Sequence, residues 1–310
     1  MSKPVNSIDD PFFIVYDSRS GSTFLANLLV KFAGAAIPPE SNFITGLLSK
    51  YPKHTIDHSF DLEKAIEVVY EDSKFRDWNL SQSEIEHYIQ KNFPIEVRDF
   101  VLQICTLYRN KYYPNSQAFG LKKGVYLDRH KEMKMMFPSS RFIGILRDGR
   151  AVFNSKKHSI YSVTGQAFET NARSAAEEWC RIYGLLRKVD QKYPNEVVTI
   201  RYEDMIREPG GIVSTLCNFL HIPQLSECSE KQQSYAIPAR YGDLHLNVNK
   251  EPLVERATAW RKSLSDEEVY VFESCAYRQL LAAGYPVVNT RMRLRSNQII
   301  EKCRSFLSLG

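Results

Sequence analysis

The sequence predicts an α/β fold in which a central parallel sheet is flanked by helices. Three segments, 12–17, 141–147 and 196–204, are short apolar runs rich in β-branched or aromatic residues. The first two are each followed by a polar turn and then by apolar residues at helical spacing. Continuous apolar strands that alternate with helices are typical of a parallel sheet covered on both faces.

The stretch between the first two strands has a different character. Residues 61–113 have the spacing of several helices, and Ser81 with Glu84 matches the capping-box pattern at the start of one of them. Pro94 is expected to open the next helix at its first position. Residues 171–192 are also predicted to be helical, because they are rich in Ala, Glu, Leu and Arg.

We expect one domain over residues 1–290, with a helical insertion at 41–118 that walls a substrate cleft. The tail, residues 291–310, is basic and partly amphipathic. A solvated terminal helix is favoured there over a membrane anchor.

Composition excludes several classes of protein. Of the 310 residues, 43% are hydrophobic and 25% are charged, which are globular values. No apolar stretch approaches the ~20 residues of a membrane helix, and the acidic start of the chain lacks the apolar core of a secretory signal. The net charge of +5 favours local anion sites over a nucleic-acid surface.

The cysteines and histidines follow no metal-binding pattern. The six cysteines form no C-x-x-C pair, and the seven histidines form no H-E-x-x-H cluster. We therefore expect reduced thiols, a cytoplasmic protein and no structural metal. The cysteines are Cys105, Cys180, Cys217, Cys228, Cys275 and Cys303.

The loop after the first strand, Asp17 to Thr23, has the composition of an anion cradle. Gly21 lies between small hydroxyl residues, so the backbone can curl around an anion with its N–H groups pointing inward. Ser22 and Thr23 add hydroxyl donors, and Arg19 adds a guanidinium fork for phosphate-type oxygens. The alternative is a serine-rich turn that only caps a helix.

This loop departs from the nucleoside-triphosphatase pattern G-x-x-x-x-G-K-[ST]. Ser22 stands where that motif has its lysine, and the first glycine of the motif is missing. A loop without the lysine and the Mg²⁺ ligand suits a donor with a simpler anionic end.

Four motifs in order resemble those of the PAPS-dependent sulfotransferases, over residues 12–286. Arg19 to Thr23 matches the loop [R/K]-[S/T]-G-[S/T]-[S/T]. Arg147 and Ser155 keep the spacing of the second motif, R-[D/N]-P-x-x-x-x-x-S, with Gly149 in place of the proline.

The third and fourth motifs lie nearer the end of the chain. A Y-E-D step occurs at Tyr202, Glu203 and Asp204, and a Trp-basic segment starts at Trp260 and is followed by Gly284-Tyr285. The pattern is nearest to the branch with a glutamate base, which includes carbohydrate, tyrosylprotein and bacterial glycolipid sulfotransferases. The resemblance implies a P-loop NTPase-like sulfotransferase fold that uses PAPS (3′-phosphoadenosine 5′-phosphosulfate), releases PAP and needs no metal.

The resemblance also implies a set of donor-binding residues. Arg147 and Ser155 would hold the 3′-phosphate, although an ion pair of Arg147 with Asp148 is the structural alternative. Tyr202 lies either beside the adenine or in the core. The full predicted set is Arg19, Ser20, Gly21, Ser22, Thr23, Phe24, Arg147, Ser155, Tyr202, Arg261 and Lys262.

The predicted catalytic residues are Glu40, Lys122 and Arg19. By resemblance, Glu40 follows the first helix and serves as the base, and Lys122 lies at the lysine of a G-x-K segment that faces the sulfuryl oxygens. His54 and His58 are the other candidates for the base, and Lys123 is the alternative to Lys122. Beside the like charge of the donor, we expect the pKa of Glu40 to rise toward neutrality.

The sequence therefore predicts sulfuryl transfer from PAPS to a hydroxyl or amine of an unidentified acceptor. Small molecules, glycans, lipids, phenols and peptides all remain open as acceptors. One alternative function is a non-catalytic module that binds PAP or another adenylyl nucleotide. A second is a P-loop kinase, which the missing loop lysine disfavours.

Overall fold

The computed structural model describes residues 10–89, 93–160, 165–225, 234–238 and 255–290. The predicted basic tail at 291–310, Cys228 and Cys303 lie outside the described residues.

A five-stranded parallel sheet forms the centre of the molecule, in the order β2-β5-β1-β6-β7. Each neighbouring pair of strands runs parallel, which confirms the predicted fold class. The strands are β1 (Phe12–Tyr16), β2 (Ala35–Ala36), β5 (Ala118–Lys122), β6 (Phe142–Leu146) and β7 (Val197–Arg201).

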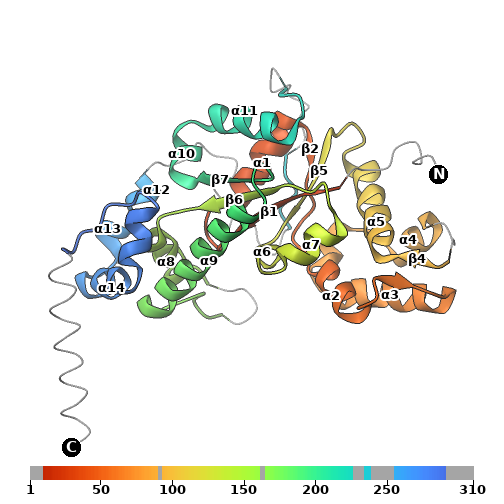
Figure 1. Cartoon of the computed structure of the whole chain (residues 1–310), viewed down its shortest axis with the longest axis horizontal. Coiled ribbons are helices and arrows are strands. Elements are labelled where there is room, and N and C mark those ends of the chain that lie inside the picture. Colours follow the sequence, from red (N-terminus) through yellow and green to blue (C-terminus); the bar gives the residue numbers. More distant parts are fainter. Residues whose placement is uncertain (1–9, 90–92, 161–164, 226–233, 239–254, 291–310) are drawn as a thin grey trace, which may run out of the picture.

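Helices cover both faces of this sheet, so β1 and β6 are buried along their whole length. Helices α1 (Ser22–Ala33) and α11 (Pro209–Leu220) pack together on one face. Helices α6 (Val125–Asp128) and α9 (Ala172–Lys192) pack on the other (Figure 1). Double coverage explains why the strands are continuous apolar runs and do not alternate with polar residues.

A second core lies where α8 (Gly149–Lys157) and α9 meet α14 (Asp266–Ala282). Its centre is the fully buried guanidinium of Arg150, which pairs with Asp148 at 2.8 Å and Glu273 at 2.5 Å. The same guanidinium lies 4.0 Å from the Trp260 ring centroid, in α13 (Trp260–Ser263). These contacts attach the α12 (Glu255–Thr258) and α13 segment to α8.

The insertion forms a helical block at one end of the molecule (Figure 1). Its aromatic residues mostly pack on one another, as the Phe43, Phe75 and Trp78 rings do at 5.2–5.4 Å, so they belong to the core. The predicted capping box of Ser81 and Glu84 is present. The elements are α2 (Phe43–Lys50), α3 (Ser59–Glu71), the 3₁₀ helix η1 (Phe75–Trp78), α4 (Gln82–Tyr88) and α5 (Val97–Tyr112).

The prediction for Pro94 was wrong. Ile95–Glu96 forms strand β4, which pairs antiparallel with β3 (Thr55–Ile56), and α5 begins only at Val97. The proline therefore precedes a strand, since its neighbours are held by backbone pairing to the 55–56 segment.

Two strands of the main sheet were not predicted. β2 contains only two alanines, and β5 has the sequence AFGLK, whose glycine and lysine weaken the strand pattern. Gly120 in β5 is required by packing, because a Cβ atom there would lie 2.3 Å from the Phe12 ring. The chain also forms α7 (His130–Met136) and α10 (Tyr202–Arg207).

Candidate active site

The predicted donor-loop and base residues follow the carboxyl ends of the parallel strands. Strand β2 leads to Glu40, β5 ends at Lys122, and β1 leads into the 17–23 loop. Strand β6 is followed by Arg147, and β7 by Tyr202. Ligands of open α/β sheets bind at this edge, so the topology alone collects these side chains. The strand order places Glu40 and Lys122 on one side of the loop and Arg147 and Tyr202 on the other.

The loop adopts the tight conformation that its composition predicts. Arg19 and Gly21 have positive φ angles of 69° and 94°, and α1 begins at Ser22. A Cβ atom on Gly21 would lie 2.5 Å from the Tyr202 ring. Only glycine fits this position, because both the backbone angle and the neighbouring ring exclude a side chain.

Arg147 lies beside this loop with part of its guanidinium unpaired. Its Nη1 donates to the Arg19 carbonyl at 2.8 Å and its Nη2 donates to the Arg256 carbonyl at 3.0 Å. The guanidinium stacks on the Tyr202 ring, 4.3 Å from the centroid. The Nε atom is buried and has no hydrogen-bond partner among the described residues.

Arg19, Arg147 and Arg256 place like charges close together. Burial and then the charges of Arg147 and Arg256 lower the pKa of Arg19. The Nε of Arg19 donates to Ser155 Oγ at 3.2 Å, which brings the loop motif and the second motif into contact. We call Arg19, Arg147, Ser155, Tyr202 and Arg256 the arginine cluster.

The predicted alternative, an ion pair between Arg147 and Asp148, does not form. Asp148 accepts from Arg150 through both carboxylate oxygens and caps α8. Within the described residues, neither Arg19 nor Arg147 forms an ion pair, although the charges of Glu203 and Asp148 act on Arg147 from nearby.

A buried ion pair fixes Ser155 against the loop. Lys156, the next residue on α8, donates to Asp17 Oδ1 at 2.6 Å at the start of the loop. Breaking such a pair leaves an uncompensated buried charge and costs about 3–5 kcal/mol. This ion pair therefore helps to fix the distance between the loop and Ser155.

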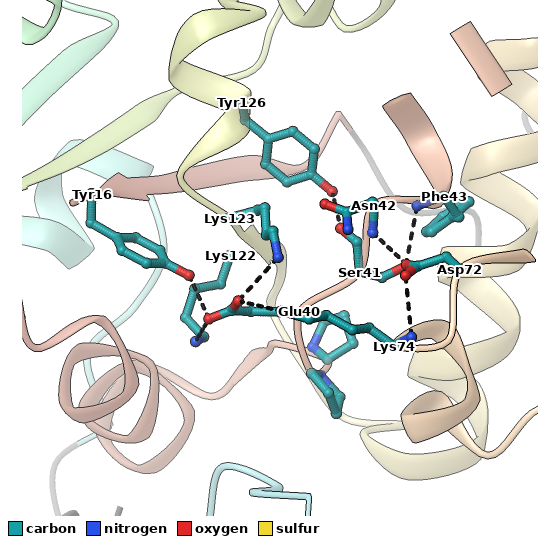
Figure 2. A network of polar contacts seen from close by, with 12 residues as sticks. Tyr16, Glu40, Ser41, Asn42, Phe43, Asp72, Lys74, Lys122, Lys123 and Tyr126 are labelled. Carbon is teal, nitrogen blue, oxygen red and sulfur yellow. Dashed lines mark hydrogen bonds and ion pairs between the residues drawn. The ribbon is translucent and has the colours of Figure 1, made fainter. Parts of the chain in front are cut away.

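Glu40 is the centre of a second group of polar residues, drawn in Figure 2. Its Oε1 atom accepts from the Tyr16 hydroxyl at 2.6 Å and from Lys122 at 2.8 Å. Its Oε2 atom lies 3.3 Å from the Lys123 ammonium and 3.8 Å from that of Lys74. We call Tyr16, Glu40, Lys74, Lys122 and Lys123 the carboxylate cluster.

The turn that carries Glu40 is held on both sides. The Trp78 indole donates to the Pro39 carbonyl at 2.9 Å, and the Tyr126 hydroxyl donates to the Ser41 carbonyl at 3.2 Å. Ser41 also donates to Asp72 at 2.6 Å. The insertion therefore positions the candidate base, in addition to any contact with an acceptor.

The pKa of Glu40 in the protein alone is set by burial and by its lysine and tyrosine partners. Burial acts to raise the pKa of Glu40, but the charges of Lys122 and Lys123 and the hydrogen bonds from Lys122 and Tyr16 outweigh it. They hold the pKa well below its usual range in the protein alone. The expected rise refers to the protein with donor bound and stays a prediction. Glu40 is an ion-paired carboxylate here, which makes it a weak base until Lys122 is drawn away.

The two histidine candidates lie in the insertion, away from the strand edge. The backbone of His54 bonds Tyr51 and Val97, and His58 precedes α3 at its N-terminal cap. Among the described contacts, neither imidazole touches the carboxylate cluster. The structure therefore brings Glu40, and neither histidine, to the lysines.

Arg261 and Lys262 lie on α13, where Arg261 stacks 4.5 Å from the Trp260 ring centroid. Their predicted role at the 3′-phosphate stays a prediction. The residue of this region that contacts Arg147 is Arg256, which sequence reasoning missed. The basic residues just before and after Trp260 were the feature of the sequence that could have pointed to Arg256.

Tyr16 and Lys74 were also missed. Tyr16 lies in an apolar strand, where its hydroxyl gives no pattern, and it also has a hydrogen bond with Ser22 of the loop. Lys74 lies in the insertion between α3 and η1, and only the fold brings it to Glu40.

Comparison with known proteins identifies the family. The sequence model of a family described as "Sulfotransferase family" matches residues 11–227, which is well over half of the chain. The chain belongs to this family. That confirms the resemblance to the sulfotransferases. The match includes the loop, Glu40, Lys122, the second motif and the Y-E-D step, whereas the fourth motif lies beyond it.

The curated relatives are similar only in part. Protein-tyrosine sulfotransferase 1 of Danio rerio is 29% identical over 129 residues, which is 40% of this chain and 34% of the relative. Protein-tyrosine sulfotransferase A of Caenorhabditis elegans is 25% identical over 153 residues, which is 48% of this chain and 37% of the relative. The chain thus spans about a third of the length of the curated relatives it matches.

Solved structures show the same fold. The sulfotransferase domain from the curacin biosynthetic pathway superposes with a TM-score of 0.58 at 16% identity, covering 91% of this chain and 99% of that one. The sulfotransferase domain of the Synechococcus PCC 7002 olefin synthase gives 0.53 at 19% identity, covering 89% and 98%. The predicted P-loop-like sulfotransferase fold is confirmed.

Within the described ranges, no helix has the length and apolarity to cross a membrane. The same part of the chain contains no group of three or more His, Cys, Asp or Glu residues placed to hold a metal ion.

Proposed function

We propose that this chain transfers a sulfuryl group from PAPS to a hydroxyl or amine of an acceptor and releases PAP. The observation that carries the proposal is the arginine cluster. Arg147 is buried and its Nε has no hydrogen-bond partner among the described residues. It lies beside Arg19, which contacts Ser155, and beside the loop whose position 21 accepts only glycine.

These residues fit a nucleotide with two anionic ends. Arg147 and Ser155 would hold the 3′-phosphate, since a phosphate dianion favours a permanent cation with several donors. The loop backbone and the start of α1 would hold the 5′-phosphate, because a helix N-terminus favours anions. Tyr202 packs against both Gly21 and Arg147, and so lies between the two ends.

PAPS supplies the chemistry: the acceptor oxygen forms a bond to sulfur while the bond from sulfur to the 5′-phosphate oxygen breaks. Glu40 would take the proton from the acceptor hydroxyl, and Lys122 would face the sulfuryl oxygens. Arg19 would offset the charge that develops on the departing phosphate oxygens.

Lys122 links these roles, because in the protein alone it donates to Glu40 at 2.8 Å. An anion near Lys122 would compete for its ammonium and relieve the force that lowers the pKa of Glu40. Glu40 would thus become a stronger base only when the donor is bound, which is the condition for the expected rise in its pKa.

The carboxylate cluster favours an enzyme over a silent PAP-binding module. A module that only binds PAP would need the arginine cluster, but it would not need a carboxylate held by Tyr16 and Lys122 next to the loop. A cytoplasmic location is part of the proposal, supported by the free thiols of the buried residues Cys105 and Cys217.

The test is incubation with labelled PAPS and a panel of hydroxylated acceptors, with PAP release as the readout. We expect acceptor-dependent PAP release that persists in EDTA, and no transfer from ATP, because Ser22 replaces the loop lysine. PAP binding without release on any acceptor class would favour the silent module. Loss of turnover in EDTA with recovery in Mg²⁺ would favour the kinase.

A further inference from the structure

The third and fourth sequence motifs meet at one carboxylate, that of Glu203. Glu203 is the second residue of α10, and its Oε2 atom accepts from the Tyr285 hydroxyl at 3.0 Å. Its Oε1 atom accepts from the backbone N–H of Asp148 at 3.0 Å. The carboxylate thus joins the segment after α14 to the start of α8, where the second motif lies.

The contact with Asp148 bears directly on Arg147. The peptide group between these two residues has one carbonyl and one N–H. The carbonyl accepts from the buried Trp179 indole at 2.9 Å, and the N–H donates to Glu203. Two side chains, from α9 and α10, therefore fix the plane of the peptide that follows Arg147. The direction in which the Arg147 side chain leaves the backbone depends on that plane.

Tyr285 fixes the carboxylate of Glu203 through its other oxygen. Tyr285 is 3% exposed, and the Arg201 guanidinium stacks 4.4 Å from the centroid of its ring. The Arg201 Nε also lies 3.9 Å from Glu203 Oε2, and the Glu203 side chain is 15% exposed. Each oxygen of Glu203 thus has a defined partner within a largely enclosed environment.

Charge and position have opposite consequences for Glu203. Its negative charge acts on Arg147, and near a phosphate site such a charge opposes an incoming anion. If charge were its main effect, removal of Glu203 would strengthen the binding of a phosphate. If its hydrogen bonds position Arg147, removal of Glu203 would weaken it. The two roles are therefore distinguished by the sign of one change in affinity.

We propose that Glu203 is a positioning residue that fixes Arg147 for the 3′-phosphate, and that Tyr285 holds Glu203 in place. This inference rests on the proposed function, and it adds the residues that make the site prefer a nucleotide with a 3′-phosphate. Glu203 and Tyr285 act through the peptide that follows Arg147, without touching the nucleotide themselves.

The test compares PAP with adenosine 5′-monophosphate (AMP), which lacks only the 3′-phosphate. Both nucleotides are titrated by calorimetry into wild-type protein and Glu203→Ala, and the ratio of the two affinities is the readout. Wild-type protein should prefer PAP by about tenfold or more, as for a charge-assisted contact. Glu203→Ala should lower this ratio by about tenfold and leave AMP affinity near that of the wild type.

Two milder variants separate position from charge. Glu203→Gln keeps an oxygen for the Asp148 N–H and an amide that can donate to Tyr285, so it should keep most of the ratio. Tyr285→Phe removes one hydroxyl and should lower the ratio by about threefold, as for one neutral hydrogen bond. The matched control is Asp204→Ala, because this neighbouring acid pairs with Arg207 at 3.3 Å at the surface. It should leave the ratio unchanged.

Tighter PAP binding by both Glu203→Ala and Glu203→Gln would assign a charge role and overturn the inference. Equal losses of PAP and AMP affinity in Glu203→Ala would indicate general damage to the fold and also overturn it, as would a failure of Glu203→Gln to keep the ratio. If Glu203→Ala does not fold, Tyr285→Phe decides: a lowered ratio supports the inference and an unchanged ratio overturns it.

The same titrations distinguish this inference from the proposed function. If wild-type protein binds PAP no better than AMP, the assignment of the arginine cluster to the 3′-phosphate fails, and the inference fails with it. If wild-type protein and every variant prefer PAP equally, that assignment stands and only the roles of Glu203 and Tyr285 are wrong.

Discussion

The arginine cluster and the carboxylate cluster lie on opposite sides of the same loop, but they are compensated differently. In the arginine cluster, Arg147 bonds two neutral carbonyls and retains an unpaired buried Nε. In the carboxylate cluster, Glu40 accepts from Tyr16 and Lys122 through Oε1 and is ion-paired with Lys123 through Oε2. The first is already arranged for an anion, whereas the second must exchange partners before it can act.

This difference assigns donor binding to the arginine cluster and the chemical step to the carboxylate cluster. Electrostatic stabilisation is most effective where the donors are fixed before the ligand arrives. A base held by a lysine is inactive until another anion takes that lysine. The comparison predicts that changes in one cluster alter donor affinity and changes in the other alter turnover.

The largest effect is expected from Glu40→Gln. The substitution keeps the size of the side chain but removes its ability to take a proton, so turnover should fall by about 10²–10⁴-fold. PAP affinity should remain near that of the wild type, because Glu40 lies outside the arginine cluster. Steady-state PAP release and calorimetry check the two parts.

The matched control is Glu63→Gln, an exposed glutamate on α3 that should leave both quantities unchanged. If Glu40→Gln kept more than about a third of wild-type turnover, a loss too small for a general base, His54 and His58 would be tested next.

Gly21→Ala should distort the loop that is assigned to the donor. The added methyl would lie 2.5 Å from the Tyr202 ring at a φ angle of 94°. We expect a loss of about 1–3 kcal/mol in the free energy of unfolding, with weaker PAP binding. Gly184→Ala has open space in α9 and should stabilise the protein by up to about 1 kcal/mol. Equal melting temperatures for both variants would contradict the packing of Tyr202 on the loop.

The smallest expected effect is a difference between two pH profiles. In the free protein the pKa of Glu40 is held well below its usual range, so the base is ionised throughout the working pH range. The profile of kcat/KM for PAPS should therefore have no acid limb from Glu40. Bound donor should raise this pKa, so kcat should increase with pH through a higher value. An acid limb near the histidine value of about 6.5 in both profiles would point to a histidine base instead.

The sequence predicted the parts of the fold that local patterns encode. β1, β6 and β7 are continuous apolar runs, and the Gly21 loop has a distinctive composition. β2 and β5 were missed because two alanines, or a strand with glycine and lysine, carry no such pattern. Their pairing is decided by the strands beside them.

The residues of the site were likewise predicted only where a local motif marks them. Arg147 and Ser155 are recognisable from their spacing, but Lys74, Tyr16 and Arg256 reach the site only through long-range packing. The low pKa of Glu40 depends on Lys122 and Lys123, which reach it only because β5 folds beside β2.

The most direct test of the account is a calorimetric titration of PAP into Arg147→Ala and wild-type protein. One lost charge-assisted contact is worth about 1.5–3 kcal/mol, so PAP affinity should fall by tenfold or more. Arg187→Ala, an exposed arginine on α9, is the matched control and should bind PAP as the wild type does. Unchanged PAP affinity in folded Arg147→Ala would contradict the assignment of the arginine cluster to the donor.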